Sequence, residues 1–303
     1  MPTPPKTLCD TCDTYAPVSS YDSLWGLWPY PLLRVSNTTL IPGTSILAGE
    51  VHFIGWRDIS WYSGFFYDTS TRRFTYIRGG DFDFSRDGSK FLMMGEGGIH
   101  LVDRLTMTSH LLLKGSDYVL PRWSVDEQWV YLTTDGSTFR MRPDGNSLML
   151  IVERFQRAWP LDDERLISFA PDNSGVVIYN MTTKERTSLV FSGLPAGLRY
   201  NDSRPRDLSP DRTKILADIS TGEGILERER RGLYLFDLTT MSARQVLRGQ
   251  YWGYEYYPKW TSNTTFMASY HCRKDTAAMI YEYDLCGRVL RQVTYKEMKF
   301  YPF

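Results

Sequence analysis

The sequence holds few residues of the kinds that metal centres and acid–base catalysis use. Its 303 residues include four histidines and four cysteines. Histidine is the side chain that most often ligates metals or moves protons near neutral pH. Cys9 and Cys12 form a single C-x-x-C pair, whereas a structural zinc site needs four ligands and a thioredoxin-like site needs a βαβ setting. We therefore expect no metal and no cofactor; the pair itself is open to being a local disulfide or two free thiols.

Net charge and long apolar runs are absent as well. Lys plus Arg equals Asp plus Glu at 35 each, so no overall field attracts nucleic acid. No run approaches the roughly 18 consecutive apolar residues of a transmembrane helix, and residues 1–20 lack the apolar core of a secretory signal. We expect a cytoplasmic location, with no nucleic-acid partner and no transmembrane segment. A periplasmic or secreted location is the alternative, because Asn37, Asn180, Asn201 and Asn263 stand in N-x-S/T patterns.

What the sequence does contain is an internal repeat of two strand-turn-strand units. The first unit is an aromatic or apolar residue, a turn rich in Ser, Pro, Asp and Gly, and an alternating apolar run, as in "WSVDEQWVYL" (123–132). The second is a hairpin with a turn of the Asp-x-Thr or Asp-Gly kind. Its marker residues are Asp68, Asp103, Arg142, Asn180, Asp237 and Asp284.

The spacing of these markers predicts the architecture. By subtraction they lie 35, 39, 38, 57 and 47 residues apart, close to the roughly 40 to 50 residues of a propeller blade. Small four-stranded sheets cannot bury both faces alone, so they must stack around an axis. We predict an all-β, six-bladed β-propeller of four-stranded antiparallel blades over residues 41–303, preceded by an irregular N-terminal arm over residues 1–40. Residues before about 45 are candidates for closing the ring by adding a strand to blade six.

The order of aromatic residue, Ser, Pro, Asp, Gly, strand, Tyr-Asp-Leu and strand resembles the TolB-like propeller repeat. That repeat also builds the non-catalytic propeller of prolyl oligopeptidase and dipeptidyl peptidase enzymes. The resemblance covers about residues 50–296 and is best in blade five, "LSPDRTKILADIS" (208–220) and "GLYLFDLTT" (232–240). It implies the fold and says little about function. The chain has no G-x-S-x-G elbow and no α/β stretch after blade six, so a non-catalytic role is favoured.

Connections of unequal length single out one face of the predicted disc. In a blade whose strands A to D run outward, the B–C loops and the D–A connectors share a face. The long segments 191–206, 221–232, 248–259 and 271–276 all belong to that face of blades five and six, and long loops on a rigid scaffold usually carry binding. Partner-binding candidates there are Tyr251, Trp252, Tyr254, Tyr256, Tyr257, Arg228, Arg230 and Arg231. The structural alternative is that the aromatics fill the gap between the two blades and that the charges are solvated.

A second set of candidates lies where the innermost strands line the axial channel. These residues are Asp81, Asp83, Arg122, Arg157, Arg206 and Lys259. Cations beside two acids can hold an anionic group or a peptide carboxylate. The alternative is mutual pairing across a water-filled channel.

Together these features predict a non-catalytic scaffold, a subunit or accessory of a larger assembly. A partner protein would dock on the blade five and six loop face and on the N-terminal arm, where "YDSLWGLWPYPLL" (21–33) is unusually apolar. The alternative is an enzyme or small-ligand sensor, of lyase or hydrolase type, that uses the axial channel.

Overall fold

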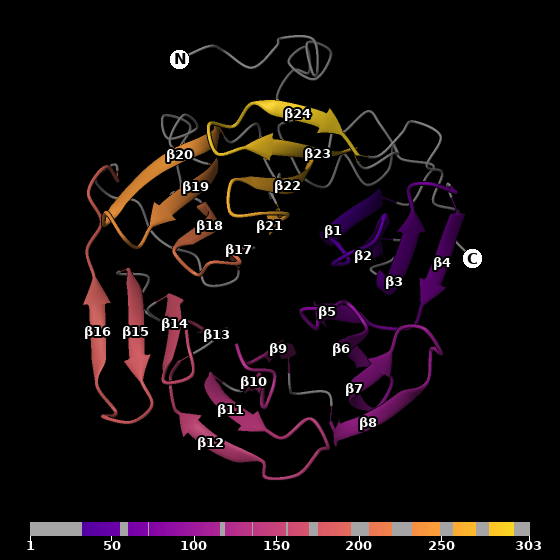
Figure 1. The fold of residues 1–303 in the computed structure, drawn as a ribbon, viewed down its shortest axis with the longest axis horizontal. Helices are drawn as coiled ribbons and strands as arrows, with labels where there is room; N and C mark the ends of the chain where they lie inside the picture. Colours follow the sequence, from indigo (N-terminus) through magenta and orange to yellow (C-terminus); the bar gives the residue numbers. More distant parts are fainter. Residues whose placement is uncertain are drawn as a thin grey trace, which may run out of the picture.

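The chain forms six four-stranded antiparallel sheets arranged around a central axis (Figure 1). The computed structural model describes residues 32–54, 60–71, 73–115, 119–134, 136–155, 157–169, 175–194, 206–219, 232–248, 257–270 and 279–293. All elements within these residues are strands, and none is a helix that could cross a membrane. The predicted all-β, six-bladed propeller is confirmed.

Each blade consists of four consecutive strands. Blade one holds β1 (Leu32–Leu40), β2 (Ile46–Ile54), β3 (Ser60–Asp68) and β4 (Arg73–Ile77). Blade two holds β5 (Gly80–Phe84), β6 (Lys90–Gly95), β7 (Gly98–Asp103) and β8 (Ser109–Lys114). Blade three holds β9 (Val119–Trp123), β10 (Val130–Thr134), β11 (Ser137–Met141) and β12 (Met149–Val152). Blade four holds β13 (Trp159–Pro160), β14 (Arg165–Phe169), β15 (Val176–Asn180) and β16 (Arg186–Leu189). Blade five holds β17 (Arg206–Leu208), β18 (Lys214–Ile219), β19 (Gly232–Asp237) and β20 (Ser242–Arg248). Blade six holds β21 (Lys259–Trp260), β22 (Thr265–Tyr270), β23 (Met279–Asp284) and β24 (Val289–Gln292).

The start of the propeller differs from the expected boundary at residue 41. Residues 32–40, which the sequence placed in the arm, form β1, the innermost strand of blade one. This strand pairs with β2 along its length, from Leu32 opposite Ile54 to Leu40 opposite Leu47. Among the described residues, no strand from before residue 45 joins the sheet of blade six. The arm residues 1–31 lie outside the described part of the chain.

The core consists of six apolar clusters, one at each interface between neighbouring blades. In β6, Phe91 packs toward blade one, whereas Leu92, the next residue, packs toward blade three. Successive side chains on a strand point to opposite faces, and both faces of a blade are covered by its neighbours. Apolar runs such as Phe91-Leu92-Met93 follow from this two-sided burial. Blades one and six meet in the same way, through Phe65, Met267 and Ile280.

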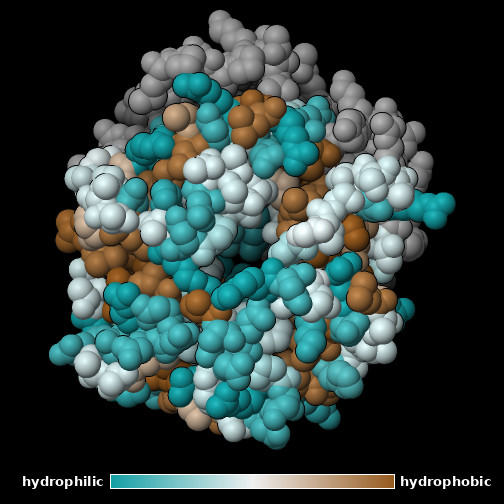
Figure 2. All heavy atoms as spheres, viewed as in Figure 1, coloured by the Kyte–Doolittle hydropathy of each residue, from teal (hydrophilic) through white to brown (hydrophobic). Residues whose placement is uncertain are grey.

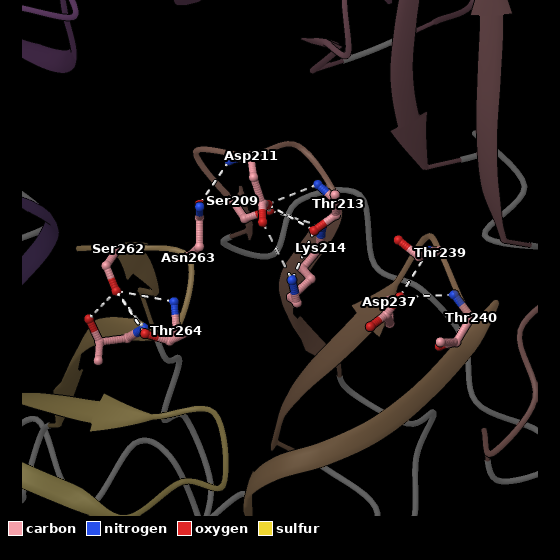
Figure 3. A network of polar contacts seen from close by, with 11 residues as sticks. Ser209, Asp211, Thr213, Lys214, Asp237, Thr239, Thr240, Ser262, Asn263 and Thr264 are labelled. Atoms are coloured by element: carbon pink, nitrogen blue, oxygen red, sulfur yellow. Dashed lines mark hydrogen bonds and ion pairs between the residues drawn. The ribbon is translucent and has the colours of Figure 1, made fainter.

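The repeated polar motifs are turn chemistry, as Figure 3 shows for blades five and six. Asp211 Oδ1 accepts hydrogen bonds from Ser209 Oγ at 2.7 Å and from the backbone N–H of Thr213 at 3.1 Å. In the next hairpin Asp237 Oδ1 accepts the N–H groups of Thr239 and Thr240, both at 2.9 Å. Asx-type bonding of this kind stabilises a tight turn. The Ser-x-Asp and Asp-x-Thr patterns therefore report the fold rather than a function.

Candidate functional site at the propeller axis

Four charged residues occupy equivalent positions on the innermost strands. Each directly precedes a residue whose pairing partner is the first or second residue of the second strand: Phe84 pairs with Phe91, Trp123 with Val130, Leu208 with Ile215 and Trp260 with Phe266. The preceding residues are Asp83 in blade two, Arg122 in blade three, Asp207 in blade five and Lys259 in blade six. Their strands β5, β9, β17 and β21 surround the axis (Figure 1). Figure 2 shows a hollow at the centre of the disc, bordered largely by hydrophilic residues.

The two aspartates form the same clasp with a tryptophan of the following blade. Asp83 Oδ2 accepts the backbone N–H of Trp123 at 2.7 Å, and the Asp83 carbonyl accepts the Trp123 indole N–H at 3.2 Å. Asp207 Oδ2 accepts the backbone N–H of Trp260 at 3.0 Å, and its carbonyl accepts the indole N–H at 3.1 Å. The chain thus carries two equivalent clasps, between blades two and three and between blades five and six, on opposite sides of the ring.

The two clasps differ in their charged partners. Lys259 Nζ lies 3.5 Å from Asp207 Oδ1, so the clasp of blades five and six contains an ion pair. Arg122 stands at the corresponding position of blade three, and its Nη1 donates to the carbonyl of Pro121 at 3.2 Å. Arg122 makes no ion pair with any carboxylate of the described residues. One clasp thus contains an ion pair, between Lys259 and a residue outside the predicted set, and the other contains none among the described residues.

The environment of Asp83 disfavours its negative charge. Burial against the channel wall raises the pKa of this carboxyl above its usual value, and the nearby charge of Asp207 adds to the increase. The charges of Arg122 and Lys259 and the N–H of Trp123 act in the opposite direction. Desolvation is the largest of these effects. These groups come from four blades, whose innermost strands surround the axis (Figure 1).

Residues with positive φ precede this ring position in blades two, three and four; in blade four the ring position is Trp159, directly before Pro160, which pairs with Leu166. Asp81, Leu120 and Arg157, each two residues before the ring position of its blade, have φ angles of 52°, 54° and 48°. The pairing register is interrupted between Gly80 and Asp83 in the first of them. Non-glycine residues seldom adopt positive φ, and bulges commonly re-aim side chains next to functional sites. The backbone N–H of Asp81 donates to Glu50 Oε1, a buried carboxylate of blade one.

The structure places five of the predicted channel residues at the start of their blades. Asp81, Asp83, Arg122, Arg157 and Lys259 all lie in or directly before the innermost strands. Arg206 begins β17, and its side chain is outside the described residues. Sequence reasoning missed Asp207. The signal was available, because "DFS" (83–85) and "DLS" (207–209) share the same three-residue pattern ahead of the turn.

Of the predicted partner-binding residues, the structure describes one. Tyr257 is partly buried and lies two residues before Lys259, at the entry to β21. The other seven, Tyr251, Trp252, Tyr254, Tyr256, Arg228, Arg230 and Arg231, fall outside the described residues. Within the described part, no three His, Cys, Asp or Glu side chains are grouped so that they could hold a metal ion.

The ends of the long connections are nevertheless placed by the strands. In an antiparallel meander the first strand starts, the second ends, the third starts and the fourth ends at one edge of the sheet. In blade five, β17 starts at Arg206, and at the same edge β18 ends at Ile219 and β19 starts at Gly232. In blade six, β21 starts at Lys259, and at the same edge β22 ends at Tyr270 and β23 starts at Met279. Blades five and six are neighbours, since they share one apolar cluster.

Comparisons with known proteins identify the fold alone. No family model and no curated protein matches the chain. Among solved structures, the β-propeller domain of the Trilobed protease from Pyrococcus furiosus, described as having an open velcro topology, is 12% identical, with a TM-score of 0.53 over 88% of this chain and 97% of that one. An oligogalacturonate lyase in complex with manganese is 11% identical, with a TM-score of 0.50 over 84% and 82%. A putative TolB from Agrobacterium tumefaciens is 13% identical, with a TM-score of 0.55 over 75% and 86%. The chain is thus a six-bladed β-propeller, a fold that it shares with parts of enzymes and with TolB-type proteins.

Proposed function

We propose that this chain is a non-catalytic, TolB-like propeller scaffold that docks a partner protein through the loop face of blades five and six. It would serve as a subunit or accessory of a larger assembly. The observation that carries the proposal is topological: the connections 220–231, 249–258 and 271–278 start and end at one edge of two adjacent blades, and the connection from blade four enters β17 at the same edge. Decorated connections on a rigid scaffold are where binding is usually found.

The packing between these two blades supports a binding role for the connector aromatics. Side chains of the strands themselves fill this interface, among them Trp260, Phe266 and Tyr283. The rings of Phe266 and Tyr283 stack with centroids 5.4 Å apart, and those of Trp260 and Phe266 meet edge-on at 6.3 Å. The described strands thus supply the packing of this interface from their own side chains. Tyr, Trp and Arg are also the residues enriched in interface hot spots.

The test is binding of a natural partner by a triple variant. The tagged full chain is purified from its native source, the co-purifying protein is identified, and its affinity is measured for Tyr251→Ala/Trp252→Ala/Tyr254→Ala. We expect binding to weaken at least roughly 30-fold, as loss of a hot spot does. The matched control is Leu105→Ala/Met107→Ala, which truncates exposed side chains in the C–D turn of blade two, at the opposite face. Wild-type affinity in the triple variant would refute the docking face.

The N-terminal arm is tested separately. Because β1 starts at Leu32, the deletion must stop at residue 31 if the propeller is to stay intact. We expect this deletion to weaken partner binding, measured by the same assay, while thermal unfolding of the propeller is preserved. Unchanged affinity and unchanged thermal stability would together remove the arm from the proposal.

Binding of a small ligand at the axis is the second candidate function. The specific observation that favours it is the clasp between blades two and three, here called the open clasp. Asp83 accepts the N–H of Trp123, the residue directly after Arg122, and among the described residues Asp83 and Arg122 form no ion pair. The two candidate sites do not share a described residue, so each can be tested without the other.

A further inference from the structure

The two clasps offer an internal comparison between a satisfied and an unsatisfied arrangement. In blades five and six, both oxygens of Asp207 have partners, since Oδ2 accepts from Trp260 and Oδ1 faces Lys259 at 3.5 Å. In blades two and three, Asp83 Oδ2 accepts from Trp123, and no donor among the described residues reaches Oδ1. The two clasps thus have the same backbone hydrogen bonds but differ in charge pairing. The clasp of blades five and six is closed by an ion pair, and that of blades two and three is open.

Arg122 leaves most of its hydrogen-bonding capacity unused. A guanidinium carries five N–H donors in a planar fork that matches a carboxylate. Among the described residues, the one hydrogen bond of the Arg122 side chain goes to the carbonyl of the preceding residue, Pro121. Arg122 and Asp83 are both only partly exposed, so an unmet hydrogen bond costs more here than on an open surface.

On the side of the axis that holds this clasp, the acidic residues precede the basic ones along the chain, whereas Asp207 and Lys259 pair with each other on the other side. Asp81 and Asp83 come from blade two, whereas Arg122 and Arg157 come from the next two blades. A simple anion on Arg122 would sit beside the carboxylate of Asp83, and a simple cation on Asp83 would sit beside the guanidinium. Only a ligand that carries both charges matches both groups, because like charges placed together oppose binding.

We propose that the open clasp binds a small zwitterion, an α-amino acid or a dipeptide, with its ammonium group on Asp83 and its carboxylate on Arg122. This inference rests on the second candidate function and names its ligand class. Ligands of this class are small molecules that carry an ammonium and a carboxylate group together.

The experiment is a thermal-shift and calorimetric screen of the full chain against free L-amino acids and dipeptides. Acetate and ethylamine serve as probes that carry one charge each. We expect at least one zwitterion to raise the melting temperature and both single-charge probes to leave it unchanged. Free amino acids and dipeptides both carry an ammonium and a carboxylate group, and the class that binds more tightly is assigned as the ligand.

Two variants locate the site. Asp83→Asn keeps an oxygen for the N–H of Trp123 but loses the negative charge, and Arg122→Gln loses the fork. Each should weaken binding at least about tenfold, the usual effect of losing a charged hydrogen bond. The matched controls are Asp211→Asn in a turn of blade five and Arg244→Gln on the outer strand β20; both should bind as the wild type does.

Stability without ligand gives an independent readout. Because burial raises the pKa of Asp83, we expect Asp83→Asn to melt no lower than the wild type at neutral pH. If Asp83→Asn fails to fold, Arg122→Gln still tests the ligand.

Three outcomes distinguish failure of the zwitterion proposal from failure of the second candidate function, ligand binding at the axis. Equal shifts with acetate and with zwitterions, both lost in Arg122→Gln, would overturn the zwitterion and retain ligand binding at the axis. A zwitterion that binds equally well to both variants would overturn this site. No shift with any probe would overturn both the zwitterion and the second candidate function.

Discussion

Single glycines set how closely neighbouring blades approach. Gly287 lies in the C–D turn of blade six with φ at 77°, and a Cβ added there would stand 2.1 Å from the carbonyl oxygen of Val246 in blade five. Gly145 has the same role between blades three and two, where the distance to the Leu112 carbonyl oxygen would be 3.0 Å. The turn of one blade thus rests on the outermost strand of the blade before it, which only a residue without a side chain permits.

We expect Gly287→Ala to destabilise the protein more than Gly97→Ala does. Gly97 has a similar φ of 84° but nothing within 4 Å of an added Cβ, so its replacement costs only the left-handed backbone penalty of roughly 1–2 kcal/mol. The clash at Gly287 adds overpacking of about 1–3 kcal/mol. Urea unfolding of the two variants measures the difference. Equal losses would show that blades five and six can separate at no cost.

Individual site residues were predictable to different degrees. The position of Asp83 and Arg122 on an innermost strand follows from the repeat alone. The absence of an ion pair between Asp83 and Arg122 does not follow from the repeat. Asp207 and Lys259 hold the same positions in blades five and six, and they do form an ion pair. Side-chain pairing across blades depends on distances that no local pattern encodes.

At the scale of the element, aspartates stabilise the turns between strands. The N–H of Ser89 and the hydroxyls of Ser85 and Ser89 lower the pKa of Asp87 to about 2. The N–H groups of Thr106 and Leu105, with the Thr106 hydroxyl, lower the pKa of Asp103 in the same way. Asn180 occupies the corresponding turn of blade four and accepts from the N–H groups of Thr182 and Thr183 at 2.8 and 2.9 Å. An uncharged amide oxygen therefore serves the same geometry.

We expect stability to fall as the pH drops below about 4. The folded pKa of these aspartates lies below the unfolded value of roughly 3.9, so their contribution is complete above that value and is lost as the pH falls toward the folded pKa, about 2 for Asp87. Asp103→Asn should show a shallower loss, because its amide keeps the acceptor and does not titrate. Melting temperatures from pH 7 to pH 2 measure both slopes, and identical slopes would contradict the assignment.

At the scale of the whole molecule, the ring closes by side-chain packing between blades one and six. Within the described residues these blades share an apolar cluster and no strand. The cluster includes Phe65 and Ile280, both fully buried. The other five interfaces join blades that are also consecutive in the chain, whereas this one joins the two ends of the propeller. It is therefore the interface at which local opening is expected to begin.

We expect Phe65→Ala to destabilise the protein by about 3–5 kcal/mol, the usual cost of a large cavity. The loss of hydrogen-exchange protection should be greatest in β1 to β3 and in β21 and β22. Phe91→Ala, in the cluster between blades one and two, is the matched control and should leave β21 and β22 protected. Uniform loss of protection over all six blades in Phe65→Ala would show that the ring opens as one unit.

The sequence by itself determined the number of blades, their strand order and their turns, because each of these follows from alternation and turn chemistry within about 40 residues. Tertiary structure alone decided that residues 32–40 form the innermost strand of blade one and that blades one and six meet by packing. It also decided that Lys259 reaches Asp207 while Arg122 and Asp83 form no ion pair. The reason is physical: closing the ring and positioning charges at the axis bring together residues that lie far apart along the chain, so no local pattern records the distances between them.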